Sequence, residues 1–127
     1  MIRKYSKKGL EKRKAEREGF PEFFQKHIEI ARNSYCEECG QRLTGDVSEI
    51  AHCLPKSYFK SVSTSDLNVL YLCGRFSANQ CHSNYDNGAV EKVKQMKIYP
   101  KVKEIFQQLK PEITETINYK VYQKYED

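Results

Sequence analysis

The chain has 127 residues, which is long enough for one domain with a small hydrophobic core. With 39% hydrophobic residues, 31% charged residues and a mean hydropathy of -0.79, it contains no run of about 18 apolar residues, so we expect no transmembrane helix. The N-terminus is rich in Lys and Arg but lacks an apolar segment, so we expect no secretory signal and a reducing, cytoplasmic location.

The net charge of +5 is concentrated at the N-terminus. Residues 1–20 hold eight basic and three acidic residues, whereas the remaining 107 residues are balanced. A basic arm on a neutral body suits a phosphate backbone, and the alternative is a solvated helix end that only aids solubility. We predict that residues 1–20 form a nucleic-acid-binding arm or helix, and its basic residues are Arg3, Lys4, Lys7, Lys8, Lys12, Arg13, Lys14 and Arg17.

The N-terminal third of the chain predicts helices. Residues 7–18 are mostly helix formers but polar, and Gly19 ends this segment. Pro21 suits the first turn of a new helix, whose apolar residues recur at helical spacing up to residue 31. His27 lies on or beside that apolar face, and we expect it to pack there rather than to bind a ligand.

The rest of the chain predicts short strands followed by helices. Residues 41–43 and 47–53 read as two strands joined at residues 44–46, and residues 68–72 as a third. A helix is expected from residue 81 to about 97, weakened at Gly88. Pro100 and Pro111 mark two closing helices, and the stripe of the last one is Ile113, Ile117, Val121 and Tyr125.

Four of the five cysteines have the spacing of a zinc site. Cys36 and Cys39 are separated by two residues and followed by Gly40, and Cys73 and Cys81 lie about 35 to 40 residues further on. We predict that the four bind one structural Zn²⁺. One alternative is that His82 replaces Cys81 as the fourth ligand, and another is that one cysteine pair is merely buried. Cys53 is left over, and we expect it to be a small packed residue.

Between and after the cysteine pairs the chain resembles a known family. His52 stands shortly before Pro55, Asn68 leads an apolar run into Cys73, and His82 follows Cys81 at the start of a helix. This order resembles the HNH endonuclease superfamily, whose ββα-metal core is built on a treble-clef zinc scaffold. Within it the chain looks most like the phage NinG/Rap recombination endonucleases, which implies a bacterial or phage-infected cell and branched DNA as a substrate.

The resemblance implies a role for each motif residue. His52 would be the general base, and Asn68 would orient His52 or its loop. His82 would bind the catalytic divalent ion, Mg²⁺ or Mn²⁺. Asp86 lies one helical turn after His82, and its carboxylate suits such a hard ion. The residues expected to hold phosphates near the site are Lys56, Lys60 and Arg75.

One position departs from the family pattern. Many HNH enzymes carry Asp or His as a metal ligand directly before the base, and this chain has Ala51, which cannot ligate. Glu49 and Asp46 are close in sequence but do not occupy its place. The consequence is either a metal ion with more water ligands, which Mg²⁺ accepts, or a degenerate site.

These observations predict an α+β fold. Its zinc-stapled treble-clef core, a short hairpin plus a helix, would span residues 21–98, with a helical extension over residues 99–127. The preferred function is a metal-dependent HNH-type DNA endonuclease. The main rival is a non-catalytic treble-clef zinc module that binds DNA or RNA. A second rival is a protein-interaction domain that docks a partner through Tyr119, Tyr122 and Tyr125.

Overall fold

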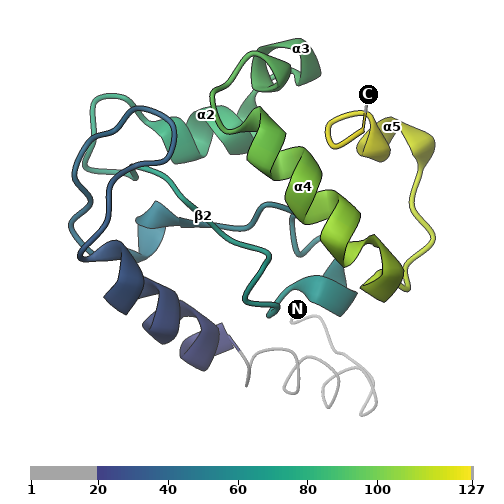
Figure 1. The fold of residues 1–127 in the computed structure, drawn as a ribbon, viewed down its shortest axis with the longest axis horizontal. Helices are drawn as coiled ribbons and strands as arrows, with labels where there is room; N and C mark the ends of the chain where they lie inside the picture. Colours follow the sequence, from purple (N-terminus) through teal and green to yellow (C-terminus); the bar gives the residue numbers. More distant parts are fainter. Residues whose placement is uncertain (1–19, 127) are drawn as a thin grey trace, which may run out of the picture.

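The computed structural model describes residues 20–126 (Figure 1). It is a small mixed helix and strand protein with one two-stranded sheet. The basic arm predicted over residues 1–20, with its phosphate-binding candidates from Arg3 to Arg17, lies outside the described residues except for Phe20. Within residues 20–126, no helix is long and apolar enough to span a lipid bilayer.

The first described segment is a helix that is continuous from residue 20 to residue 31. Phe23, His27 and Ala31 are buried, and their spacing of four residues places them on one face. Ser34 ends the helix, because its hydroxyl donates to the carbonyl of Ile30 at 2.7 Å. The predicted helix near Pro21 and the packing position of His27 are therefore confirmed.

The sheet consists of β1 (Ile50–Ala51) and β2 (Leu70–Tyr71), which pair antiparallel. The predicted hairpin between residues 41–43 and 47–53 is wrong, because Arg42 instead bridges Tyr35. Residues Val47–Glu49 form a 3-10 helix, η1, started by a capping box between Asp46 and Glu49. Each strand has only two residues, so the pairing is decided by the surrounding loops rather than by strand propensity.

Two short helices replace the long one predicted from residue 81 to residue 97. The first, α2, spans Cys81–Asn87, and the second, α3, spans Val90–Lys94. The break falls at Gly88, where a Cβ atom would lie 2.4 Å from the carbonyl oxygen of Asn84. The glycine therefore ends α2 by letting the backbone turn back against it.

The closing helices are only partly as predicted. Helix α4 (Tyr99–Leu109) has Pro100 in its first turn, as expected. After η3 (Lys110–Glu112) the chain is extended at Ile113, and a helix returns only at α5 (Tyr119–Tyr122). The predicted stripe does not lie on one helix, because residues 113–117 are β-branched except for Glu115, and Asn118 starts α5 by capping the N–H of Lys120.

The sheet lies between the first helix and α4. His52 and Cys53 follow β1 and face opposite ways. The His52 ring stacks on Phe23 of the first helix, with centroids 5.2 Å apart. The Cys53 thiol lies 3.9 Å from the carbonyl of Val102 in α4. Figure 1 shows the first helix and α4 on either side of β2, so one core serves both faces of the sheet.

The C-terminal tyrosines belong mostly to this core. Tyr125 is buried and stacks on Phe106, with centroids 5.6 Å apart, and its edge meets Phe59. Tyr122 packs edge-on against Phe106. Only Tyr119 is largely exposed, so a partner-docking surface made of all three tyrosines does not exist in this fold.

Candidate functional site

The four cysteines predicted to bind zinc come together. The thiol sulfurs all lie within 4.8 Å of one another, and the sulfurs of Cys39 and Cys73 are 3.8 Å apart; the set is Cys36, Cys39, Cys73 and Cys81. Four thiolates at about 2.3 Å from a tetrahedral Zn²⁺ would be about 3.8 Å apart. The cluster therefore fits a metal ion such as zinc, and His82 is not part of it.

A tight turn builds the first half of the cluster. The N–H of Gly40 donates to the carbonyl of Cys36 at 2.9 Å, and the N–H of Cys39 points at the Cys36 sulfur at 3.4 Å. Gly40 has a φ of 81°, which a glycine adopts without strain. Since N–H donors favour the thiolate over the thiol, the turn prepares Cys36 and Cys39 for a metal ion.

The second half comes from two other elements. Strand β2 leads into Cys73, and α2 begins at Cys81, whose N–H points at the Cys73 sulfur at 3.4 Å. The two glutamates between Cys36 and Cys39 hold the turn in place. Glu37 accepts the N–H of Tyr71 in β2 at 2.8 Å, and Glu38 accepts the N–H of Ile98 ahead of α4 at 3.0 Å. The cluster thus ties the sheet, α2 and α4 together.

The cysteines differ in how readily they ionise. Burial raises the pKa of Cys36 and of Cys81. Burial acts the same way on Cys39, but hydrogen bonds, led by that from the Gln41 backbone, outweigh it and lower its pKa to about 7. Cys53 is outside the cluster and fully buried, and burial raises its pKa to about 12, as fits the predicted packing role.

His52, the predicted general base, is held in one orientation. Its Nε2 lies 2.7 Å from the carbonyl oxygen of Ser63, so Nε2 carries the proton and donates it to that oxygen. Nδ1 then keeps a lone pair and has no hydrogen-bond partner among residues 20–126. Burial beside Phe23 lowers the pKa of His52, which keeps the ring neutral near pH 7.

The hydrogen bonds of Asn68 go to the loop that carries His52 and not to the His52 ring. The amide is fully buried, and its oxygen accepts the N–H of Leu54 at 2.7 Å. Its nitrogen donates to the carbonyls of Leu54 at 3.0 Å and Val62 at 3.1 Å. Asn68 therefore clamps both ends of the segment between His52 and the Ser63 carbonyl.

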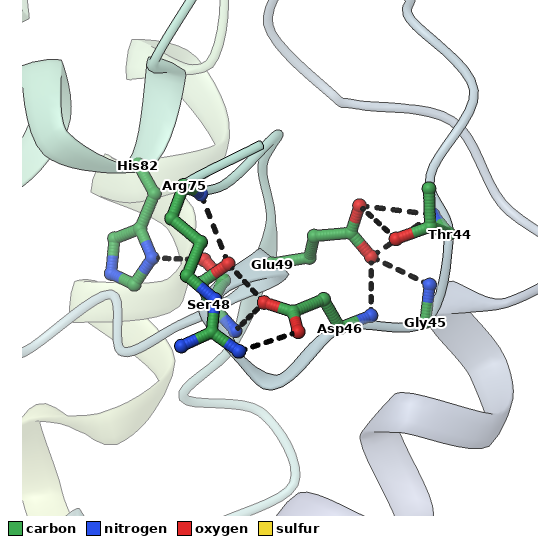
Figure 2. Close-up of polar contacts among 7 residues, drawn as sticks. All are labelled: Thr44, Gly45, Asp46, Ser48, Glu49, Arg75 and His82. Carbon is green, nitrogen blue, oxygen red and sulfur yellow. Dashed lines mark hydrogen bonds and ion pairs between the residues drawn. The ribbon is translucent and has the colours of Figure 1, made fainter. Parts of the chain in front are cut away.

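His82 and Asp86 lie side by side on α2. The His82 Nε2 atom is 3.0 Å from Asp86 Oδ2. Its Nδ1 atom donates to the Ser48 carbonyl at 2.5 Å (Figure 2). The hydrogen bond to Asp86, opposed by burial, raises the pKa of His82. Two ligands at about 2.1 Å in octahedral geometry are about 3.0 Å apart, so this pair can share one hard cation.

The pair opens onto solvent. His82, Asp86 and Arg75 line an open pocket of about 240 Å³ together with Ser48 and Gly74. Asp86 and His82 are also near enough to His52 to affect its pKa. The predicted base and the predicted cation ligands therefore belong to one neighbourhood, although they come from the end of β1 and from α2.

The segment η1 organises this neighbourhood. The Ser48 carbonyl accepts the hydrogen bond from His82 Nδ1, and the Ser48 hydroxyl accepts one from the backbone N–H of Arg75 at 3.0 Å. Asp46 binds the guanidinium of Arg75 at 3.0 Å. Gly74 packs so closely that a Cβ atom there would lie 2.1 Å from the Ser48 hydroxyl. Figure 2 shows Arg75 and His82 gathered around Ser48.

Within residues 20–126, no side chain takes the place of the metal ligand that the family pattern has at position 51. Ala51 is fully buried in β1. Glu49 is buried as well, and its carboxylate accepts the backbone N–H groups of Thr44, Gly45 and Asp46 at 2.7 to 3.1 Å (Figure 2). Asp46 is committed to capping η1 and to Arg75. A cation here would have His82 and Asp86 as its nearby ligands.

The predicted phosphate-binding residues fall at different places. Arg75 lines the pocket itself. Lys56 is exposed, lies over the ring of Phe20 at 5.0 Å and is near enough to lower the pKa of His52. Lys60 begins η2 (Lys60–Val62) and is exposed. Of these three basic residues, Arg75 and Lys56 are therefore the two that the structure ties to the site.

Comparison with known proteins gives no further guide: no family model, no curated protein and no solved structure matches this chain.

Sequence reasoning missed the groups that orient the two histidines. These are the main-chain carbonyls of Ser63 and Ser48, which no side-chain pattern reveals. One signal was readable: Asp46 and Glu49 are spaced as a capping box, which predicts a helical start there instead of a strand.

Proposed function

We propose that this protein is a metal-dependent DNA endonuclease of HNH type, which hydrolyses phosphodiester bonds next to a structural zinc site. The observation that carries the proposal is the pair of histidines held by main-chain carbonyls. His52 donates Nε2–H to Ser63, which leaves its Nδ1 unbonded. His82 donates Nδ1–H to Ser48 and directs Nε2–H at Asp86, so a cation bound there would displace that proton.

In this proposal His52 acts as the base. Its Nδ1 takes a proton from a water molecule as the water oxygen attacks phosphorus. The bond from phosphorus to the leaving oxygen breaks, and that oxygen takes a proton from solvent. A pKa below the ordinary value of about 6.5 leaves His52 unprotonated at neutral pH, because burial disfavours the imidazolium.

In this proposal His82 and Asp86 hold the divalent cation, Mg²⁺ or Mn²⁺. Such an ion supplies positive charge to the phosphate oxygens and to the leaving oxygen. His82 keeps Nε2 directed at Asp86, and Asp86 contributes a carboxylate oxygen. Arg75, which shares the pocket, would hold a phosphate of the strand. Branched or recombination DNA as substrate rests on the family resemblance alone.

A second candidate is a non-catalytic zinc module that binds DNA or RNA. The buried Ala51 favours it, because Glu49 is committed to backbone N–H groups and does not replace the missing ligand. The unbonded Nδ1 of His52 and the close approach of His82 Nε2 to the Asp86 carboxylate favour the nuclease instead.

Cleavage of supercoiled plasmid and of a branched DNA tests the proposal. Zinc-loaded protein is assayed in Mg²⁺, in Mn²⁺ and with EDTA, beside His52→Ala and His27→Gln. We expect metal-dependent cutting that His52→Ala loses and that His27→Gln, which changes a histidine with no role in the proposed reaction, retains per folded molecule. Zinc content and thermal unfolding report folding. If folded wild type binds these DNAs but cuts neither in either metal, the binding module is correct.

A further inference from the structure

The most exposed large apolar side chain in the described residues stands beside the proposed site. Phe76 is 78% exposed. It lies at the tip of a turn that the N–H of Ser77 closes on the carbonyl of Gly74 at 3.0 Å. The guanidinium of Arg75 lies over its ring, 5.0 Å from the ring centroid. The other face of the ring is free for a partner.

The turn that carries Phe76 is fixed at both ends. The Arg75 N–H donates to the Ser48 hydroxyl at 3.0 Å, and the Ser77 hydroxyl donates to Gln41 at 2.8 Å. The segment also runs between two zinc-site cysteines, Cys73 and Cys81. A rigid turn that keeps a phenyl ring in water, instead of folding it inward, presents a prepared contact surface rather than a loose loop.

Arg75 connects this ring to the pocket. Its guanidinium covers one face of Phe76, binds Asp46 at 3.0 Å and lines the pocket of His82 and Asp86. A flat ring next to a cation is the combination that binds a nucleotide of a single strand, because the ring stacks on the base while the cation meets the phosphate.

We propose that Phe76 stacks on an unpaired nucleobase of the DNA substrate, with Arg75 against the adjoining phosphate. The inference rests on the proposed function, because it names the kind of DNA that the same site takes. Bases inside an intact duplex are already stacked on both faces, so this contact requires a single-stranded, flapped or junction segment at the cutting position. The proposed contact predicts that the protein prefers such DNA whatever its base sequence.

The chain has no tryptophan, which makes the test direct. In Phe76→Trp the single indole reports stacking by its fluorescence, and Tyr119→Trp, which replaces another exposed aromatic residue, is the matched control. Zinc-loaded protein is titrated without Mg²⁺ or Mn²⁺, so that no DNA is cut. The probes are a single-stranded oligonucleotide, its blunt duplex and the duplex with a single-stranded flap.

We expect single-stranded and flapped DNA to quench the indole fluorescence of Phe76→Trp, the blunt duplex to leave it unchanged, and the Tyr119→Trp control to respond to none. Since stacking on an aromatic side chain contributes about 1 to 3 kcal/mol per base, Phe76→Ala should weaken the Kd for flapped DNA about fivefold or more, with the duplex Kd unchanged.

Equal quenching by all three DNAs, or a Phe76→Ala protein that binds flapped DNA as wild type does, would overturn the inference. Equal weakening for flapped and blunt DNA would overturn it too, because Phe76 would then be a general contact. The proposed function fails separately. If the protein stacks on DNA bases but never cuts, the inference about Phe76 stands and the proposed nuclease function is wrong. If wild type and Phe76→Ala cut and bind DNA alike, only the nuclease function stands.

Discussion

Two histidine–aspartate pairs in this protein make the same contact in opposite surroundings. His27 Nε2 lies 3.2 Å from Asp66 Oδ1, and His82 Nε2 lies 3.0 Å from Asp86 Oδ2. His27 is only 2% exposed, and burial, outweighing its contact with Asp66, lowers its pKa. His82 lines an open pocket, and its contact with Asp86 raises its pKa.

The partner of Nδ1 distinguishes the two pairs further. In His27 this atom lies 2.7 Å from the Tyr71 hydroxyl, so with Nε2–H on Asp66 it accepts the tyrosine proton and no ring nitrogen is left free. In His82 Nδ1 donates to a main-chain carbonyl and Nε2–H faces Asp86 at the edge of an open pocket, and we propose that a cation displaces this proton and is shared by Nε2 and Asp86. The two pairs therefore differ in the second hydrogen bond of the ring and in exposure to solvent, and on these two differences we propose that only the His82 pair binds a cation.

Removing one of the four clustered cysteines, the expected zinc ligands, should break both pairs at once. Tyr71 lies just before Cys73, and His82 follows Cys81, so both pairs depend on elements that end in the cluster. Structural zinc sites contribute about 10 to 16 kcal/mol of apparent binding free energy, which is as large as the whole stability of a domain. We expect Cys73→Ala to lose bound zinc and cooperative thermal unfolding, measured by metal analysis and circular dichroism.

The fifth cysteine is the control for that experiment. Cys53→Ala removes a buried thiol outside the cluster and should keep one zinc ion per chain. Cooperative unfolding of zinc-free Cys73→Ala at an unchanged temperature would show that the cluster is not what holds the fold together.

A change at Gly74 should separate the two pairs. In Gly74→Ala the new Cβ atom would meet the Ser48 hydroxyl at 2.1 Å, so η1 and the turn must move apart and the Ser48 carbonyl must leave His82. Overpacking of this kind costs about 1 to 3 kcal/mol. Denaturant unfolding should show that loss, and the ring signals of His82 should shift in NMR spectra while those of His27 stay in place. Shifts confined to His27 would refute the assignment of Ser48.

Much of the scaffold could be predicted because it is encoded in short, local signals. The prediction that four thiols would meet is confirmed, since the spacing around Cys36 and Cys39 admits few other structures. The helix after Pro100 is confirmed for a similar reason. The pairing of β1 with β2 could not be predicted, because two-residue strands carry almost no pattern. The final helix failed where β-branched residues before Asn118 oppose it.

The candidate site was readable as residue types but not as geometry. The positions of His52 and His82 pointed to chemistry, yet the tautomer of each ring depends on a backbone carbonyl contributed by Ser63 or Ser48. Such carbonyls are present at every residue, so nothing in a sequence distinguishes these two. The prominence of Phe76 likewise depends on how its turn is anchored.

Neutralising the aspartate in each histidine–aspartate pair compares the two pairs directly. Asp86→Asn removes the carboxylate proposed to bind the cation, and we expect cleavage in Mg²⁺ to fall by at least about tenfold. Asp66→Asn makes the same chemical change at an exposed side chain beside His27, so its rate should match wild type. Initial cleavage rates at several Mg²⁺ concentrations decide the matter. Equal rates for both variants would mean that Asp86 is no more functional than Asp66.

The smallest expected effect is the pH response of His27. Its folded pKa lies below the ordinary value of 6.5 because it is buried, so folding favours the neutral ring, which faces Asp66, Tyr71 and, at longer range, Lys26. The resulting stability is complete above about pH 6.5 and is lost as the pH falls through the folded pKa. NMR titration should show His27 titrating below 6.5, and lower still in Asp66→Asn. A midpoint above 6.5 would contradict this environment.

The most direct test of the central claim is a Mn²⁺ titration followed on the ring signals of the three histidines. Paramagnetic broadening falls steeply with distance, so an ion held by His82 and Asp86 should broaden His82 first, His52 next and His27 last. Zinc stays in its thiolate site throughout, because Mn²⁺ prefers oxygen and nitrogen ligands. Uniform broadening of all three rings, or loss of the His27 signals first, would show that this pocket is not a divalent-cation site.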